Sequence, residues 1–265
     1  MQIIGRVESL WRYPVKSMRG EQLNEAFVGF SGIYGDRLYA FCSTGAIAGF
    51  PFLTSREQEQ MLLYQPRFRS AQSMRLPPNL RDAEALAPGA TPLYAAQPET
   101  VVDVTAPDGK TYSIDDPVLI ERLTAGLGDR HALSLIRSDR SLTDCRPVSL
   151  FGIHTARQLA EEAAAVVDQR RFRANIYVDF SSGKGFAEDE LTGKTVRIGR
   201  KATLAVLERD PRCKMITLDP DTAEPNPEVI RCVARNHEGK AGVYAAVLVE
   251  GVVAAGDEVV LLDTH

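Results

Sequence analysis

Short segments with strand-like patterns, each bounded by turn-forming residues, recur along this chain and restrict the folds that it can adopt. These segments are 3–11, 23–30, 37–42, 61–64, 101–105, 110–114, 133–137, 148–151, 170–180, 195–198, 202–207, 243–248 and 258–262. Pro107-Asp108-Gly109 predicts a hairpin turn between two of them, 101–105 and 110–114. Helical signals are fewer: caps at Asp116-Pro117 and Asn226-Pro227, and an amphipathic pattern over 155–167. The pattern predicts an α+β, mostly β protein with barrel-like sheets, rather than a doubly wound parallel sheet.

The order of these segments changes near the middle of the chain. A chain of 265 residues is long for one domain and comfortable for two. The short helix expected after Asp116-Pro117 stops by Gly128, where the first domain can end. The sequence therefore predicts one domain over 1–125 and a second over 126–265.

Composition argues against several classes of protein. The net charge is −4 and no dense Lys/Arg stripe occurs, so we expect no nucleic-acid partner. No apolar run approaches the length of a membrane span, and the N-terminal segment lacks a signal-peptide core. The four cysteines are far apart and form no CxxC pair, which argues against a zinc site, an iron–sulfur cluster or a disulfide framework. We therefore expect a cytoplasmic protein that does not bind membranes.

One cysteine stands in a context that favours chemistry. Cys213 follows Asp-Pro-Arg directly after an apolar strand, where Pro211 stops regular pairing and the chain turns. Arg209 and Arg212 flank the proline, and nearby guanidinium groups favour the reactive thiolate over the thiol. The alternative is a small buried apolar side chain between two surface arginines.

Several polar residues in predicted turns suit an anionic ligand. Lys16-Ser17 follows Pro14, and Asp36-Arg37 lies on another turn, so a lysine, a hydroxyl and a guanidinium are available for a phosphate. The alternative is a pair of solvated turns. Arg173 and Asn175 are predicted two apart on one strand face, an awkward place for an arginine and an amide unless they bind something polar.

These motifs occur in the order found in one known family. The first part contains YPVKSMRG, GIYGDR and FLTSRE, and the second contains RPVSLFG, RFRANIYVDF and RCKMITLDPDT. The chain resembles the family built on the molybdenum cofactor sulfurase C-terminal (MOSC) domain. It is most similar to the branch that includes the mitochondrial amidoxime-reducing component and related bacterial proteins. The resemblance implies an N-terminal β-barrel domain followed by a β-barrel-like MOSC domain with a few helices.

The resemblance also implies a site. Cys213 would be the molybdenum ligand and catalytic residue, with the metal carried by a molybdopterin dithiolene. Positions that would bind the cofactor, including its phosphate, are Lys16, Ser17, Arg37, Thr54, Ser149, Arg173, Asn175, Arg209, Arg212 and Thr217. Two departures bear on the substrate class: Ala174 stands where the family often has proline, and Ile216 where the branch usually has threonine.

The function implied is reduction of N-hydroxylated or N-oxygenated compounds by a molybdenum-cofactor oxidoreductase. No iron–sulfur motif is present, so electrons would come from an external ferredoxin, flavoprotein or cytochrome, and we expect a monomer. The alternative is a sulfurtransferase, or a cofactor binding, delivery or storage protein, with a Cys213 persulfide in the sulfur-handling case. Domains of this family have also been linked to pyridoxal phosphate, but the sequence indicates no Schiff-base lysine.

Overall fold

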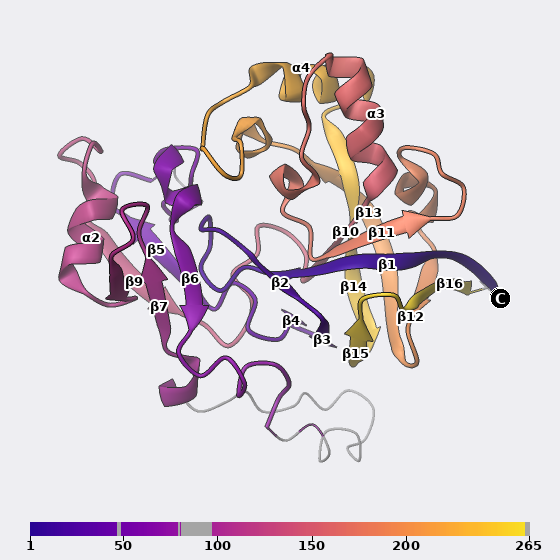
Figure 1. The fold of residues 1–265 in the computed structure, drawn as a ribbon, viewed down its shortest axis with the longest axis horizontal. Coiled ribbons are helices and arrows are strands. Elements are labelled where there is room, and N and C mark those ends of the chain that lie inside the picture. The colour runs from indigo at the N-terminus through magenta and orange to yellow at the C-terminus, as the bar shows by residue number, and fades with distance from the viewer. Residues whose placement is uncertain (47–48, 79, 81–96, 263–265) are drawn as a thin grey trace.

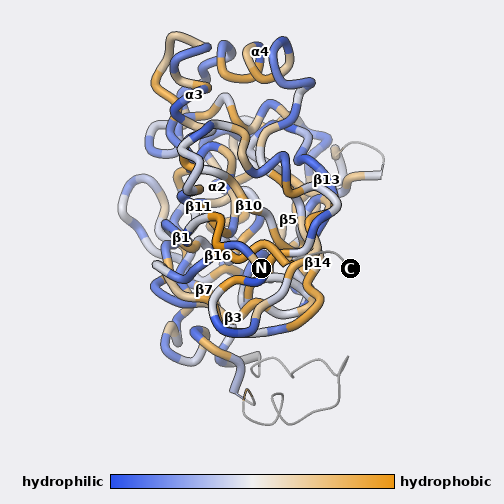
Figure 2. Tube along the Cα trace, turned by 90° about the vertical axis from the view of Figure 1, so that its right-hand side faces the viewer, coloured by the Kyte–Doolittle hydropathy of each residue, from blue (hydrophilic) through white to orange (hydrophobic). Residues whose placement is uncertain are grey.

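Seven strands close into a barrel in the computed structural model, which describes residues 1–46, 49–78, 80 and 97–262. Their order is β11 (Ile176–Phe180), β10 (Val148–Gly152), β14 (Lys240–Val249), β13 (Ala202–Pro211), β12 (Thr195–Ile198), β16 (Glu258–Leu262) and β1 (Gln2–Arg12). β1 pairs back onto β11 and closes the barrel, while β2 (Glu21–Leu23) extends it from β1. Hydrophobic stretches follow the barrel strands, such as β14 (Figure 2). The predicted mostly β fold is confirmed.

Alternation of side chains explains why these strands form a filled barrel. Along β13, Ala202, Leu204 and Val206 are buried, while the residues between them are more exposed. Inward apolar side chains from all seven strands build one core cluster, as expected for a small barrel whose interior is packed. The barrel is therefore a rigid scaffold, and its strand ends are the places that can carry a site.

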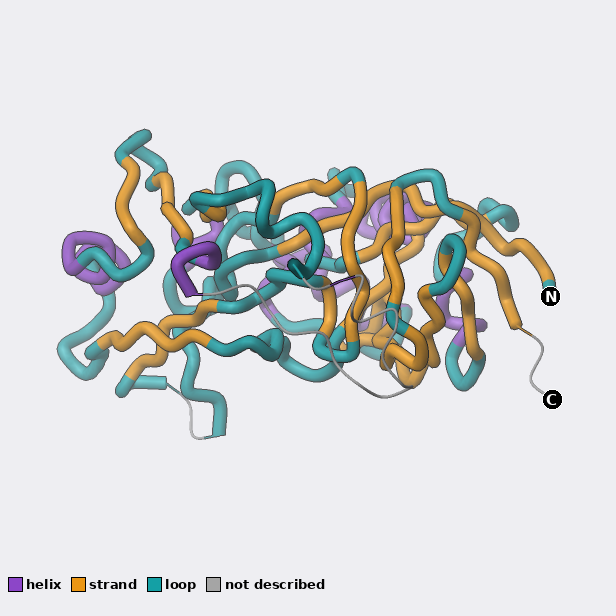
Figure 3. The backbone as a smooth tube through the Cα atoms, turned by 90° about the horizontal axis from the view of Figure 1, so that it is seen from below, coloured by secondary structure: helices purple, strands orange, loops and turns teal. Residues whose placement is uncertain are grey.

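Three smaller sheets lie beside the barrel (Figures 1 and 3). They are β3 (Glu25–Gly29) with β4 (Gly32–Ile33) and β15 (Gly251–Ala254); β5 (Tyr39–Ser43) with β9 (Leu133–Arg137); and β6 (Gln65–Phe68) with β7 (Val102–Thr105) and β8 (Thr111–Ser113). The predicted turn between β7 and β8 is confirmed, because the Ala106 N–H donates to the Lys110 carbonyl across Gly109. The β5–β9 and β6–β7–β8 sheets pack around a second core cluster, whereas Ala26, Val28, Ile33 and Val253 of the β3–β4–β15 sheet belong to the barrel core.

Helices are short and have recognisable ends. Those bounded within the described ranges are α2 (Pro117–Thr124), α3 (Ile153–Ala163) and α4 (Pro227–Asn236), with 3₁₀ turns η1 (Glu59–Leu63), η2 (Gln97–Thr100), η3 (Gln169–Phe172), η4 (Ala187–Leu191) and η5 (Lys214–Thr217). Both predicted caps are confirmed: the Asp116 side chain accepts from the Val118 N–H, and Asn226 from the Glu228 N–H. No helix in the described ranges is long and apolar enough to span a bilayer.

The two halves of the chain exchange strands. β1 comes from the first half but completes the barrel of the second half, between β11 and β16. β9 and β15 come from the second half but pair with β5 and β3 of the first half. Strand pairs therefore join segments on either side of residue 125, and the predicted domains 1–125 and 126–265 stay a prediction. Segments from both halves meet where the polar residues gather.

Three local predictions were wrong. Residues 61–64 are not a strand: neighbouring side chains Met61 and Leu62 are both buried, which a 3₁₀ turn allows and a one-sided strand does not. The helix expected to Val167 ends at Ala163, because Ala164 adopts a left-handed conformation. The expected strand over 170–180 begins only at Ile176, because Asp168 caps a 3₁₀ turn before it.

Candidate functional site

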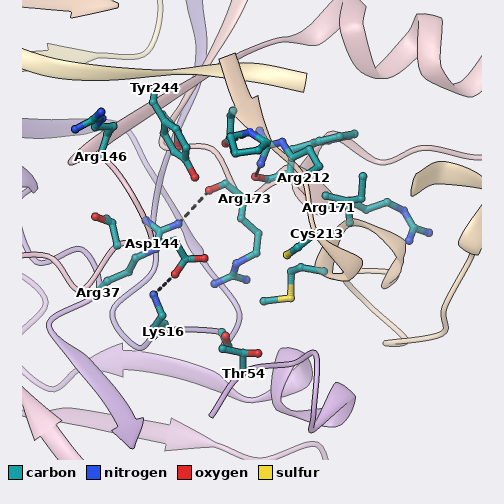
Figure 4. Close-up of a pocket in the computed structure, with 18 of the residues that line it drawn as sticks. Lys16, Arg37, Thr54, Asp144, Arg146, Arg171, Arg173, Arg212, Cys213 and Tyr244 are labelled. Carbon is teal, nitrogen blue, oxygen red and sulfur yellow. Dashed lines mark hydrogen bonds and ion pairs between the residues drawn. The ribbon is translucent and has the colours of Figure 1, made fainter. Parts of the chain in front are cut away.

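A pocket opens where segments from both halves of the chain meet (Figure 4). The first half contributes the turns that carry Lys16, Arg37 and Thr54. The second half contributes the connection between β9 and β10, the turn before β11, and the end of β13 with Cys213. Strand ends and turns thus supply nearly all of the wall, which is where side chains are free for chemistry.

Cys213 lies at the end of β13 with an exposed free thiol, which faces the pocket. Pro211 ends the strand, and Cys213 then serves as the N-cap of η5. The turn is held by the Cys213 carbonyl, which accepts from the Ile216 N–H at 3.2 Å. The predicted position just past a strand end is confirmed, and the alternative of a buried apolar side chain is wrong.

Arg212 and Arg209 form ion pairs with carboxylates, whereas the sequence predicted that they favour the Cys213 thiolate and bind the cofactor. Arg212 lines the pocket, but its guanidinium turns into the wall: it lies 2.8 Å from Asp210 and donates to the Ala241 and Phe172 carbonyls. Arg209 is absent from the pocket lining and pairs with Asp189 at 2.8 Å and Glu238 at 3.2 Å. Because carboxylates neutralise both arginines, their influence on the Cys213 thiol is weaker than the sequence alone indicates.

Asp210 is a buried carboxyl in the pocket wall that sequence reasoning missed. Burial raises its pKa to about 6, against the opposing effect of Arg212. Its Oδ1 atom has no hydrogen-bond partner in the described part of the chain. The Tyr244 phenol stands nearby, and burial together with Asp210 raises its pKa. A carboxyl with this pKa changes its charge near neutral pH, so it can hold or release a proton.

Lys16 is held in the pocket by the opposite half of the chain. Its ammonium is ion-paired with Asp144 and donates to the Leu142 carbonyl at 2.7 Å. The ring of Phe52 lies 4.9 Å from Nζ. Burial lowers the pKa of Lys16, and Asp144 partly offsets this. Ser17 beside it has a φ of 66°, a left-handed conformation that non-glycine residues adopt mainly where function or packing requires it.

Arg37 and Arg173 enclose the ring of Tyr13. Their guanidinium carbons lie 4.6 Å and 4.3 Å from its centroid. Burial acts to lower the pKa of Arg37, but its ion pair with Asp36, together with Tyr13 and Asp144, outweighs burial and raises the pKa. Arg173 points into the pocket toward the space between Lys16 and Cys213 (Figure 4), and its buried Nη2 atom has no partner among the described residues. Burial, with Arg37 adding to it, lowers the pKa of Arg173 to about 10.

Arg173 and Asn175 do not share a strand face as predicted. Arg173 has a φ of 52° and ends η3, so its side chain leaves the turn rather than a strand. Asn175 is buried, and its side chain accepts from the Ser149 N–H at 3.2 Å and hydroxyl at 3.3 Å. Asn175 and Ser149 line the pocket, but their hydrogen bonds to each other connect β10 to the segment before β11.

The two predicted threonines lie in different places. Thr54 lines the pocket, where its hydroxyl donates to Glu57 and accepts from Arg56 Nε at 3.1 Å. Thr217 is absent from the lining, and its buried hydroxyl donates to the Lys214 carbonyl at 2.8 Å, which stabilises η5. The structure therefore brings all the predicted site residues to one pocket except Arg209 and Thr217.

The lining is strongly cationic within an acidic protein. Seven cations and two carboxylates give it a net charge of +5: Lys16, Arg37, Arg56, Arg146, Arg171, Arg173 and Arg212 against Asp144 and Asp210. Carboxylate partners are found for all but two of these cations. Arg56 and Arg173 have none in the described ranges, which favours an anionic ligand.

Other residues were missed because no local signal points to them. Arg56 reaches the pocket from a turn and stacks on Phe50, with its guanidinium carbon 4.6 Å from the ring centroid. Asp144 arrives from a polar loop more than a hundred residues further along the chain. Only for Asp210 did a signal exist, since Asp-Pro directly precedes the cysteine turn. In the described part of the chain, no group of three or more His, Cys, Asp or Glu residues could hold a metal, so protein ligation would rest on the single thiol.

Two family models match the chain, one after the other. Residues 4–116 match the MOSC N-terminal beta barrel domain, and residues 137–260 match the MOSC domain. A comparison with curated proteins finds no match.

Solved structures that match this chain include the YuaD protein from Bacillus subtilis, which is 14% identical over 100% of this chain and 99% of that chain, with a TM-score of 0.49. YiiM from Geobacillus stearothermophilus is 20% identical over 44% of this chain and 55% of that chain, with a TM-score of 0.35. YiiM from Escherichia coli is 21% identical over 45% of this chain and 56% of that chain, with a TM-score of 0.32. The assignment of the two MOSC domains rests on the family models and not on these distant structures.

Proposed function

We propose a molybdenum-cofactor function on the premise that this chain carries a MOSC N-terminal beta barrel domain followed by a MOSC domain. The MOSC domain is associated with proteins that bind the molybdenum cofactor. The finer proposal is an oxidoreductase that reduces N-hydroxylated or N-oxygenated compounds with electrons from an external protein. The observation that carries it is an exposed Cys213 thiol in a cationic pocket built from both halves of the chain.

The residues of the pocket fit the chemistry of this cofactor. Molybdopterin combines a phosphate with a dithiolene. The phosphate needs cations to bind it, and the dithiolene leaves few coordination positions on the metal for protein ligands. The net charge of +5 and the partnerless Arg173 Nη2 suit the anionic part. A single thiol, Cys213, suits a metal whose other ligands are not protein side chains, because thiolate is a soft donor.

The roles of the side chains follow from where they lie. Cys213 would bind the metal, and Lys16, Ser17 and Arg37 would hold the phosphate. Arg56 stands beside Lys16 over the same ring, Phe50, and would add a further guanidinium to the phosphate group. Arg173 would neutralise charge between the phosphate site and the thiol.

The proposed reaction has a simple balance. One N–O bond breaks, two electrons and two protons enter, and water leaves with the oxygen atom. The cofactor, when bound, supplies the two-electron redox chemistry. Asp210 would relay the two protons from solvent through Oδ1, because a pKa of about 6 lets the carboxylate that pairs with Arg212 take up and release a proton near neutral pH.

Cys213→Ser tests this function. We expect the variant to keep its fold but to lose reductase activity, because a hydroxyl is a much poorer ligand for this metal than a thiolate. Molybdenum would be measured by elemental mass spectrometry, and pterin by the fluorescence of its oxidised form, after expression in a host that makes the cofactor. Cys145→Ser is the matched control, since Cys145 is also exposed but does not line the pocket. Full reductase activity of a Cys213→Ser variant that still holds molybdenum and pterin would rule out the ligand role.

A second function is favoured by the same exposed thiol. Cys213 could carry a persulfide and act as a sulfurtransferase, or the pocket could bind and deliver the cofactor to another protein. Intact-mass analysis separates the cases: a mass increase of one sulfur atom on metal-free protein favours sulfur transfer. Near-equimolar molybdenum and pterin favours the oxidoreductase. A cytoplasmic monomer that receives electrons from a separate protein remains part of the proposal.

A further inference from the structure

We propose that Asp144 is an internal anion that occupies the phosphate site, and that a ligand phosphate must displace it. The proposal rests on the proposed function, since it takes Lys16, Ser17 and Arg37 as the phosphate-binding residues. It adds a role for a residue that neither the motifs nor the family models assign. Asp144 would then select dianionic phosphate ligands over monoanions.

The contacts of Lys16 carry the first step. An ammonium group has three protons to donate, and in this structure one goes to Asp144 Oδ1 and one to the Leu142 carbonyl at 2.7 Å. A single donor is left for any ligand. The phosphate cluster is therefore already engaged by a carboxylate from the opposite half of the chain (Figure 4).

The surroundings of Asp144 show why its carboxylate stays there. Burial acts to raise its pKa, but Lys16, Arg37 and Arg56 outweigh burial and keep the pKa below its usual value. These three cations are the ones that would bind a phosphate. Asp144 remains over half exposed, at 57%, so solvent or a ligand can reach it without opening the core.

The connection that carries Asp144 is tied to the same residues. It runs between β9 and β10, and the Ser138 N–H donates to the Leu38 carbonyl while the Leu142 N–H donates to the Arg37 carbonyl, both at 2.9 Å. β10 then begins at Val148 inside the barrel. Between Ser138 and Val148 only a short segment needs to move to withdraw Asp144, and the Leu142 N–H bond to Arg37 is the contact that this movement would loosen. Phosphate binding and movement of this loop are thereby coupled.

Competition with a tethered carboxylate produces selectivity. A free monoanion such as acetate has the same charge as Asp144 but lacks its tether, so it competes poorly. A phosphate dianion has a larger charge and more acceptor oxygens, and several cations can meet it at once. Removing the Asp144 charge should therefore strengthen binding of all anions and reduce the preference for phosphate.

Isothermal titration calorimetry of the cofactor-free protein with inorganic phosphate, at constant ionic strength and pH 7.5, tests this. We expect Asp144→Asn to bind phosphate about tenfold more tightly than the wild type, the factor set by loss of one competing charge-assisted hydrogen bond. Acetate should bind measurably only to Asp144→Asn. Asp139→Asn is the matched control, because Asp139 lies on the same connection but pairs with Arg137 outside the pocket, and it should behave as wild type.

Equal or weaker phosphate binding by Asp144→Asn would overturn the proposal and make Asp144 a residue that orients Lys16 for the ligand. No phosphate binding by either protein would overturn it too. Hydrogen exchange of the wild type gives an independent test: saturating phosphate should speed exchange at Leu142, and unchanged exchange counts against displacement. Failure of the proposed function is distinct, because it appears as absent molybdenum and pterin in cofactor-competent wild type.

Discussion

At the scale of single residues, one cation of the pocket, Arg173, destabilises the fold. Arg173 has no carboxylate partner in the described ranges, its Nη2 atom is buried without a hydrogen bond, and burial lowers its pKa to about 10. An unpaired buried charge destabilises a fold, although the Tyr13 ring offsets part of this. Its neighbour Arg171 differs, because it pairs with Asp219 at 3.0 Å. Such a cost is expected where a ligand supplies the missing partner.

Arg173→Met tests this interpretation. The melting temperature of the cofactor-free variant should be no lower than that of the wild type, because the change removes a buried unpaired charge. Pterin content after expression in a cofactor-competent host should fall severalfold, since one charge-assisted contact is worth about 1.5–3 kcal/mol.

Arg171→Met is the matched control for that experiment. The substitution leaves the Asp219 carboxylate and the Thr217 carbonyl without the guanidinium that pairs with them. Calorimetry should therefore show a melting temperature lowered by about 2–4 °C or more. A lower melting temperature for Arg173→Met, with unchanged pterin content, would show that Arg173 stabilises the fold instead of serving a ligand.

At the scale of elements, one carboxylate joins the two helices that cover the barrel. Glu162 on α3 accepts hydrogen bonds from Asn236 at 3.0 Å and from His237, at the end of α4, at 2.6 Å. Gln158 adds a further bond at 2.7 Å. Burial would raise the pKa of Glu162, but these hydrogen bonds outweigh it and lower the pKa to about 2. The contact matters for the site because η5, which follows Cys213, packs on α4.

Glu162→Gln should lower the free energy of unfolding at pH 7 by about 1 kcal/mol, or the melting temperature by about 2–4 °C. Because the folded pKa is depressed, this stabilisation is present above the unfolded pKa of about 4.3 and is lost as the pH falls toward about 2. Denaturant titrations should therefore show the gap between wild type and variant closing below about pH 4. Glu161→Gln, at an exposed neighbouring position, should leave stability unchanged at every pH. A gap at pH 2.5 as large as the gap at pH 7 would contradict the assigned cause.

At the scale of the whole molecule, the pocket depends on strands exchanged between the halves. β1 fills the position between β11 and β16, and the turn with Lys16 follows directly from it. The barrel wall that carries Cys213 is thus closed by the segment that leads into the phosphate cluster. Opening the barrel would expose two strand edges and separate the cations from the thiol.

A fragment of residues 126–265 should therefore not fold alone, because its barrel lacks β1. We expect it to aggregate or to show no cooperative unfolding by circular dichroism, whereas coexpression with 1–125 should yield a soluble complex on size-exclusion chromatography. Fusing residues 1–12 to the fragment through a flexible linker is the matched control and should restore part of the cooperativity. Cooperative unfolding of 126–265 alone would show that β1 is dispensable for the barrel.

The sequence by itself determined the features that depend on a few neighbouring residues. The caps at Asp116 and Asn226, the turn at Gly109 and the place of Cys213 past a strand end all rest on local backbone chemistry, and each was predicted. Only the tertiary structure decided which distant groups meet. It closed the barrel with β1, turned Arg209 away from the pocket and brought Asp144 to Lys16 across more than a hundred residues. Such contacts depend on strand register and on long-range packing, which no local pattern encodes.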